Sequence, residues 1–288
     1  MRRRQELPCE RQHDFKTVLV THTFTSLRHP LEKLQEAEHF LARLIESHGL
    51  EFPFELNAFL SACRSSTFVM QKALAHVPAF DSWYRLRRDE MKADAAMRFF
   101  IELRNISQKL GPVSYVGGSG LDGRWTYRFV SSSQTVPSEL IGRDIVDCCA
   151  EQLQKLARLL LSYFRAYPFD ACPFHAFTEE GMTALKYSFA DAEKASGIPA
   201  GWTDIAEIPN VEKLRLLRRE IEPLDLATFG CLADGDFQKD GVPLKIPTAS
   251  GSDLVDDVAA LFEAKHDNPP PPRELFISAI MRRIKDAQ

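Results

Sequence analysis

The sequence predicts a mainly α protein: a helical bundle with one small β-hairpin and additional helices toward the C-terminus. Three observations predict this class. Apolar residues recur at three- and four-residue steps over most of the chain. Proline and glycine mark the ends of these periodic stretches. Only the segment from about 113 to 130 combines the aromatic and β-branched residues that are typical of paired strands.

The first half of the chain accounts for three predicted helices and the hairpin. An amphipathic helix is expected over 30–48, before Gly49, and a second over 53–77, before Pro78. The third is predicted as one long helix over 81–110, with Asp94, Arg98 and Glu102 forming a charged ladder on one face. Strands are expected over 113–116 and 124–130, joined by a glycine-rich turn.

The second half is predicted to be helical with one irregular stretch. A helix over 138–167 is expected to use Ser138 as its cap and to carry Ile141 on its apolar stripe. Further helices are predicted over 178–196, 210–222, 252–266 and 273–285, whereas 225–251 is predicted to be irregular. The domains expected are an N-terminal extension (1–30), a helical domain with the hairpin (31–135), a helical extension (136–268), and a proline-rich spacer with a C-terminal helix (269–288).

Composition narrows the possible functions. With 36 Lys and Arg against 40 Asp and Glu, the net charge is -4, so any RNA contact must come from a local patch. We expect a cytoplasmic protein without a membrane contact, because no signal-peptide core or long apolar stretch is present. The scattered cysteines predict reduced thiols. No cofactor or metal is expected: the GxGxxG segment at 118–123 precedes a strand, and the cysteines lack zinc-site spacing.

The most informative feature is Arg104-Asn105 near the end of the third predicted helix. An arginine on a rigid helix can grip a phosphate with its planar fork of donors, and a neighbouring asparagine can orient it. These two residues are the catalytic candidates. Ligand-binding candidates are Lys109, Arg98, Glu102, Asn57 and Arg64. The polar stripe on the second helix (Asn57, Ser61, Arg64 and Ser65) suits either a hydrogen-bonded seam between helices or a set of groups that orients Arg104.

Three short segments together resemble a HEPN-type helical domain over about 31–135. They are Glu38-His39-Phe40-Leu41, the segment from Leu56 to Ala62, and Glu102-Leu103-Arg104-Asn105. The resemblance implies a homodimer with a composite cleft, and its active members are metal-independent ribonucleases, many of them in toxin-antitoxin or antiphage systems. It places Arg104 and Asn105 at the Arg-polar positions of the motif. Gln108, Lys109 and Leu110 stand where the motif histidine is expected.

Because the motif histidine is missing, we expect binding of a phosphate group without efficient RNA cleavage. Because an unperturbed lysine stays protonated near neutral pH, Lys109 can attract a phosphate but is a poor general base. We therefore expect a HEPN-like protein with a degenerate motif that binds RNA or a nucleotide, or a cognate protein partner, in a regulatory role. Two alternatives stay open: a metal-independent ribonuclease with a different acid or base, and a dimeric scaffold in which Arg104 pairs with an acidic neighbour such as Asp94 of a partner helix.

Overall fold

The computed structural model confirms the mainly α class. It describes residues 24–119, 125–131, 134–197, 200–201, 203–204, 208–219, 221 and 223–237. The described residues form two units. The larger unit contains Leu27–Tyr167 and the described residues from Leu224 on, and the smaller contains Pro168–Pro223 with the described residues just before Leu27. The boundary expected near residue 136 lies inside the larger unit.

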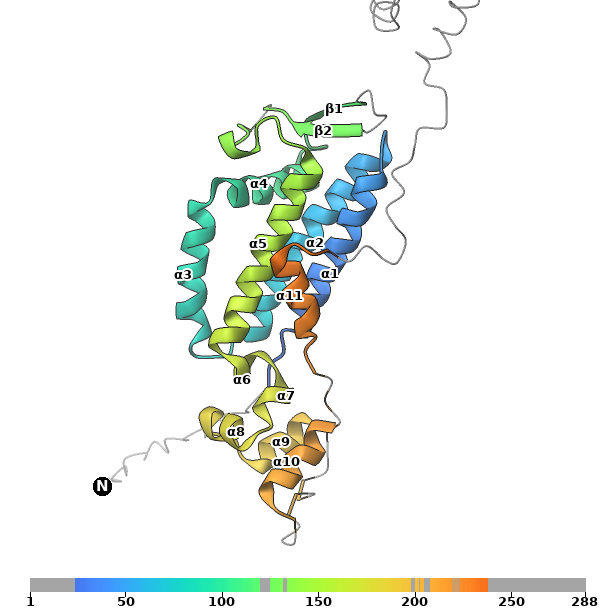
Figure 1. Cartoon of the computed structure of the whole chain (residues 1–288). Coiled ribbons are helices and arrows are strands. Elements are labelled where there is room, and N and C mark those ends of the chain that lie inside the picture. The colour runs from blue at the N-terminus through green and yellow to red at the C-terminus, as the bar shows by residue number, and fades with distance from the viewer. Residues whose placement is uncertain are drawn as a thin grey trace, which may run out of the picture. The chain divides into compact units, whose positions relative to one another are not determined.

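The larger unit is a bundle of helices with a hairpin at one end (Figure 1). Its elements are α1 (Arg28–Glu46), α2 (Glu51–Leu74), α3 (Phe80–Ala93), α4 (Ala95–Lys109), β1 (Tyr115–Ser119), β2 (Trp125–Phe129), the short 3-10 helix η1 (Ser138–Leu140), α5 (Ile145–Ala166) and α11 (Leu226–Asp234). Helix α1 packs along α2 and α5, and α11 packs on α5. The core contains fully buried side chains from α1, α2 and α5, including Leu34, Phe59 and Tyr163. This bundle fixes the position of α4.

The long helix predicted over 81–110 is wrong: it is two helices, α3 and α4, that meet at a sharp bend (Figure 1). Asp94 adopts an extended conformation between them, and its Oδ1 accepts a hydrogen bond from the backbone N–H of Met97 at 2.9 Å. An aspartate in this position is a strong helix N-cap. Because Asp94 lies outside both helices, the charged ladder from Asp94 through Arg98 to Glu102 does not form.

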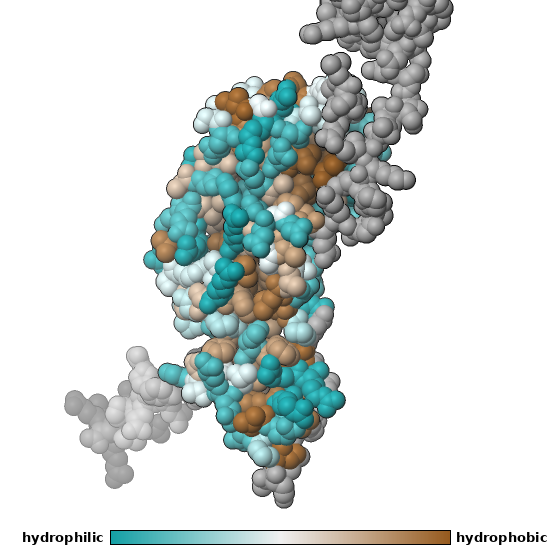
Figure 2. Space-filling model, in the orientation of Figure 1, coloured by the Kyte–Doolittle hydropathy of each residue, from teal (hydrophilic) through white to brown (hydrophobic). Residues whose placement is uncertain are grey.

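The hairpin is confirmed, with β1 and β2 antiparallel and Gly117 opposite Tyr127. A Cβ atom on Gly117 would lie 2.4 Å from the Tyr127 ring, so glycine is required for this close packing. Tyr127 also stacks on Phe52 of α2, with ring centroids 3.6 Å apart, which attaches the hairpin to the bundle. Exposed apolar side chains, such as Phe54 and Trp125, occur at this end of the larger unit, where Figure 2 shows hydrophobic surface.

Two predictions about the remaining helices of the larger unit are wrong. Helix α5 begins at Ile145 with Asp144 as its cap, not at Ser138, and Ile141 is 65% exposed instead of lying in the core. Residues 226–234, predicted to be irregular, form α11. Asp225 caps its start by accepting from the N–H of Thr228, and Gly235 ends it in a left-handed conformation.

The smaller unit is built from short helices: α6 (Pro168–Ala171), α7 (Pro173–Ala176), α8 (Glu179–Leu185), α9 (Phe189–Ala195) and α10 (Asn210–Arg219). The single helix predicted over 178–196 is wrong, because Lys186 takes a left-handed conformation and Ser188 starts a new helix with a capping box. The buried carboxylate of Glu193 accepts hydrogen bonds from the backbone N–H groups of Gly201 and Thr203, which ties these two residues to α9.

Several predictions fall outside the described residues. These are the helices over 252–266 and 273–285, the proline-rich spacer at 269–272, the turn of the hairpin and most of the N-terminal extension. Within the described part of the chain, no helix combines the length and the hydrophobicity that crossing a bilayer requires.

Candidate functional site

Helix α4 carries the Arg-Asn pair, and the structure separates its two members. Successive residues of an α-helix point about 100° apart. Arg104 therefore lies at the edge of the core and is half-buried, whereas Asn105 is exposed. Arg104 belongs to the side of α4 that packs toward α2, and Asn105 lines a hollow with Glu102 and Lys109. The predicted site residues thus form two sites on different sides of one helix.

The first site contains the two arginines Arg64 of α2 and Arg104 of α4. Burial lowers the pKa of the Arg64 guanidinium, and the nearby positive charge of Arg104 lowers it further. Arg64 also lies over the ring of Phe68, with its guanidinium carbon 4.0 Å from the ring centroid. Two like charges are therefore held close together by the packing of α2 against α4.

No carboxylate neutralises this pair among the described residues. Neither arginine forms an ion pair there, and the Nε atom of Arg104 is buried without a hydrogen-bond partner. The carboxylate of Asp94, which a scaffold role would pair with Arg104, accepts instead from Nζ of Lys155 on α5 at 2.5 Å. The two positive charges therefore have no counter-ion in the described part of the chain, and this favours the binding of an anion to the exposed side of the pair.

The polar stripe on α2 contacts α4. Nε2 of Gln108 on α4 donates to Oγ of Ser61 at 3.2 Å, and the Ser65 hydroxyl donates to the Ser61 carbonyl at 2.8 Å. This contact is a hydrogen-bonded seam between the helices, one of the two expected roles of the stripe. Oδ1 of Asn57 is buried and has no partner in the described part of the chain. The seam holds α4 on α2 and so positions Arg104 relative to Arg64.

The interior beside Arg64 is too small for a ligand. A cavity of about 30 Å³ lies there, lined mainly by apolar side chains such as Leu60 and Phe100, together with Gln152. A space of this size holds a water molecule and nothing much larger. An anion at the arginine pair must therefore bind at the surface, on the exposed side of the two guanidinium groups.

The second site is an open hollow of about 340 Å³ on the solvent side of α4. It is lined by Glu102, Asn105, Ile106, Lys109, Leu110 and Gln134. Three of the predicted candidates, Glu102, Asn105 and Lys109, therefore do lie together. Gln134, which follows the hairpin in sequence, was not identified from the sequence because nothing in its local pattern indicates that the chain returns to α4.

The remaining candidate, Arg98, does not join either site. Its Nη1 donates to the backbone carbonyl of Lys92, the last turn of α3, and thereby covers the bend at Asp94. Arg98 therefore supports the junction between α3 and α4. Its role follows from the break in the helix, which the sequence analysis did not predict.

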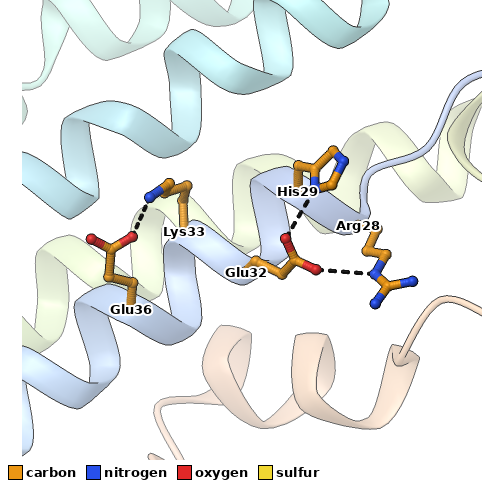
Figure 3. Close-up of polar contacts among 5 residues, drawn as sticks. All are labelled: Arg28, His29, Glu32, Lys33 and Glu36. Carbon is orange, nitrogen blue, oxygen red and sulfur yellow. Dashed lines mark hydrogen bonds and ion pairs between the residues drawn. The ribbon is translucent and has the colours of Figure 1, made fainter.

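Charged side chains elsewhere in the described structure form ion pairs with neighbours on the same helix. At the start of α1, the Glu32 carboxylate accepts from His29 Nδ1 at 2.9 Å and from Arg28 Nε at 3.0 Å, and Lys33 pairs with Glu36 (Figure 3). The hydrogen bonds from His29 and then Arg28 lower the pKa of Glu32. Such exposed pairs within one helix contribute little to stability. Arg64 and Arg104 differ because they are half-buried and form no ion pair among the described residues.

Three buried cysteines are poorly suited to act as nucleophiles. Burial raises the pKa of Cys148 to about 11, and burial also raises the pKa values of Cys63 and Cys149, so these thiols stay protonated near neutral pH. Across the described ranges, no three His, Cys, Asp or Glu side chains gather closely enough to hold a metal ion. The arrangement on α4 suits anion binding by cationic hydrogen-bond donors.

Comparison with known proteins adds one partial match. Residues 35–117 match the family model described as bacteriophage lambda protein ea47. No curated protein and no solved structure matches the chain. The matched segment covers most of α1 and all of α2, α3 and α4, so it contains both Arg64 and Arg104. The chain is similar to that family over residues 35–117 alone.

Proposed function

We propose that this chain is a HEPN-like protein with a degenerate motif that binds a phosphate group of RNA or of a nucleotide between Arg64 and Arg104, without cleaving it. The observation that carries the proposal is the pair of guanidinium groups, held together without a carboxylate among the described residues, with the buried Nε of Arg104 left unpartnered. A phosphate supplies the negative charge that the pair lacks, and arginine suits it geometrically.

Binding is favoured over cleavage because the described groups at the pair include no proton acceptor suited to neutral pH. The neighbours of Arg64 include the Thr67 hydroxyl, to which its Nη1 donates at 3.4 Å, and the phenol of Tyr84. Burial raises the pKa of Tyr84 above its ordinary value. General acid-base catalysis needs a group that titrates near the working pH, and none of these does.

The partial match to the bacteriophage lambda protein ea47 model supports a phage-related setting, because it covers the helices that carry the arginine pair. Within the proposal, the protein is cytoplasmic, acts in regulation or defence, and forms a homodimer. Sedimentation equilibrium of the full chain tests the dimer directly. A monomer at every concentration would remove the dimer from the proposal and leave the arginine site intact.

The binding proposal is tested by fluorescence anisotropy with labelled RNA. Arg104→Met keeps the aliphatic packing and removes the guanidinium, so we expect affinity to fall about tenfold or more, because hydrogen bonds to charged groups contribute about 1.5–3 kcal/mol. Arg104→Lys keeps the charge but loses the planar fork, and its affinity should lie between the two. The matched control is Arg215→Met, since Arg215 is exposed and pairs within its own helix with Glu212.

The outcomes separate the three readings of the site. Equal affinity of wild type and Arg104→Met contradicts the proposal and favours a scaffold. RNA cleavage that leaves 2′,3′-cyclic phosphate ends and disappears in Arg104→Met would establish the ribonuclease alternative. A loss of affinity in Arg104→Met, with Arg215→Met unchanged and the RNA intact, supports binding.

A further inference from the structure

The hollow on the solvent side of α4 contains the polar groups that recognise a planar base. Its lining combines one carboxylate (Glu102), one ammonium group (Lys109), two side-chain amides (Asn105 and Gln134) and two aliphatic side chains. Oε1 of Gln134 is buried and has no hydrogen-bond partner in the described part of the chain. The volume of about 340 Å³ lies within the range of small-molecule sites.

The two charged groups stand at opposite ends of this hollow. Glu102 and Lys109 are seven residues apart on α4, which corresponds to about 10 Å along the helix axis. Neither forms an ion pair among the described residues, and both are exposed. A ligand that lies along the helix therefore meets an acceptor at one end and a donor at the other. The edge of a purine, with a hydrogen bond of about 2.9 Å at either end, spans a gap of this order.

Guanine matches this polarity better than the other bases. Its N7 and O6 are adjacent acceptors, which is the pattern that lysine and arginine bind. Its N1–H and its amino group are adjacent donors, and a carboxylate such as that of Glu102 can accept from both at once. Ile106 and Leu110 present apolar surface for the face of the ring, and the amides of Asn105 and Gln134 can satisfy the remaining edge.

Adenine presents the opposite pattern on the same edge. Its N1 is an acceptor, so it would face the Glu102 carboxylate with two lone pairs directed at each other, and only its amino group could donate. Uracil offers a single donor between two acceptors. A carboxylate fixed at one end of the hollow therefore discriminates against both bases.

We propose that the hollow formed by Glu102, Asn105, Lys109 and Gln134, with Ile106 and Leu110, binds a guanine base, carried by a free nucleotide or by RNA. This site is separate from the phosphate site at Arg64 and Arg104, because it lies on another side of α4. Glu102 is the specificity-determining residue, and Lys109 anchors the O6 and N7 edge.

The test uses the full chain and two-dimensional ¹H–¹⁵N NMR, observing the side-chain amides of Asn105 and Gln134. The ligands are guanosine and adenosine, which carry no phosphate, then GMP and AMP, and finally short oligouridines with one central guanine or adenine. We expect guanine-containing ligands to shift these signals and to bind about tenfold or more tightly than their adenine counterparts, as good bidentate base contacts do.

Glu102→Gln replaces one acceptor oxygen by a donor, so the preference for guanine should disappear. The matched control is Glu46→Gln, the same change at an exposed glutamate at the end of α1. Arg104→Met should leave the preference between guanosine and adenosine unchanged, because no phosphate is involved. If the guanine preference is present but Arg104→Met binds phosphate-containing ligands as tightly as the wild type does, only the function proposed above is contradicted.

The ligand series identifies the source of the base. Comparable binding of guanosine and GMP indicates a free nucleoside or nucleotide, whereas binding of the guanine-containing oligomer alone indicates RNA, and either result supports the site. The proposal is overturned if no ligand distinguishes guanine from adenine, or if Glu102→Gln keeps the full preference.

Discussion

The two ends of α4 differ in how their polar groups are satisfied. At the N-terminal end, Asp94 caps the helix and accepts from Lys155, and Glu139 Oε1 accepts from the backbone N–H of Ala96 at 3.0 Å. Near the C-terminal end, the positive charge of Arg104 lowers the pKa of Arg64, and the Nε atom of Arg104 has no partner among the described residues. The first end is arranged for stability. The second end tolerates unfavourable electrostatics, which is typical of a binding site.

The largest effect that follows from this comparison is at Asp94. Asp94→Ala removes the N-cap of α4 and leaves the Lys155 ammonium without its carboxylate. We expect the free energy of unfolding to fall by about 2 kcal/mol, mostly from the cap. Urea denaturation followed by circular dichroism measures it. A loss below about 0.5 kcal/mol, the usual range for an unimportant surface change, would show that this end of α4 does not stabilise the fold.

A smaller effect is expected in the pH dependence of stability. Burial alone would raise the pKa of Asp94, but the hydrogen bonds from Lys155 and from the backbone of Met97 outweigh it, and the net pKa is lowered. A carboxyl whose folded pKa lies below its unfolded value, about 3.9, stabilises the protein above that pH and loses this contribution as the pH falls through the folded pKa.

Denaturation midpoints of wild type and Asp94→Asn, measured at neutral pH and at several values below about pH 4, test this window. The variant keeps an oxygen that can cap the helix but cannot ionise. We therefore expect the stability difference between the two proteins to shrink as the pH falls below about 4. A difference that is the same at all pH values would mean that the Asp94 charge does not stabilise α4.

The smallest change in stability is expected at the other end of the helix. Arg104→Met keeps the aliphatic contact and removes the repulsion with Arg64, so the free energy of unfolding should change by no more than about 0.5 kcal/mol. The melting temperature should be unchanged or slightly higher. A loss of about 2 kcal/mol or more would identify Arg104 as a structural residue and would remove the contrast between the two ends.

The sequence predicts much of the fold because its local signals are strong. The spacing of Leu31, Leu34 and Leu41 and the stop at Gly49 place α1 within a few residues of its observed bounds. The bend at Asp94 was missed because neither proline nor glycine marks it. Two contacts of Asp94 fix it: the local N-cap on the N–H of Met97, and the contact with Lys155, 61 residues away, which no local pattern reveals. The residues that begin and end α11, the N-cap Asp225 and the terminal Gly235, are visible in the sequence. The apolar stretch between them is too short to predict a helix on its own.

The sequence predicts which residues belong to the candidate site, but it does not predict how they are arranged in space. Arg64, Arg104, Glu102, Asn105 and Lys109 were all candidates from residue type and helical spacing. Which of them lie together depends on the direction of α4, and that direction is set by the bend and by the packing of Gln108 on Ser61. Their division into an arginine pair and a separate hollow is therefore tertiary information.

The most direct measurement is the ¹⁵N NMR signal of the Arg104 Nε–H group, assigned with Arg104→Lys and followed during titration with RNA and with inorganic phosphate. We expect a progressive shift of this signal, because a phosphate bound on the exposed side of the same guanidinium group changes its electrostatic environment. A signal that stays unchanged while RNA binds elsewhere on the chain would contradict the account.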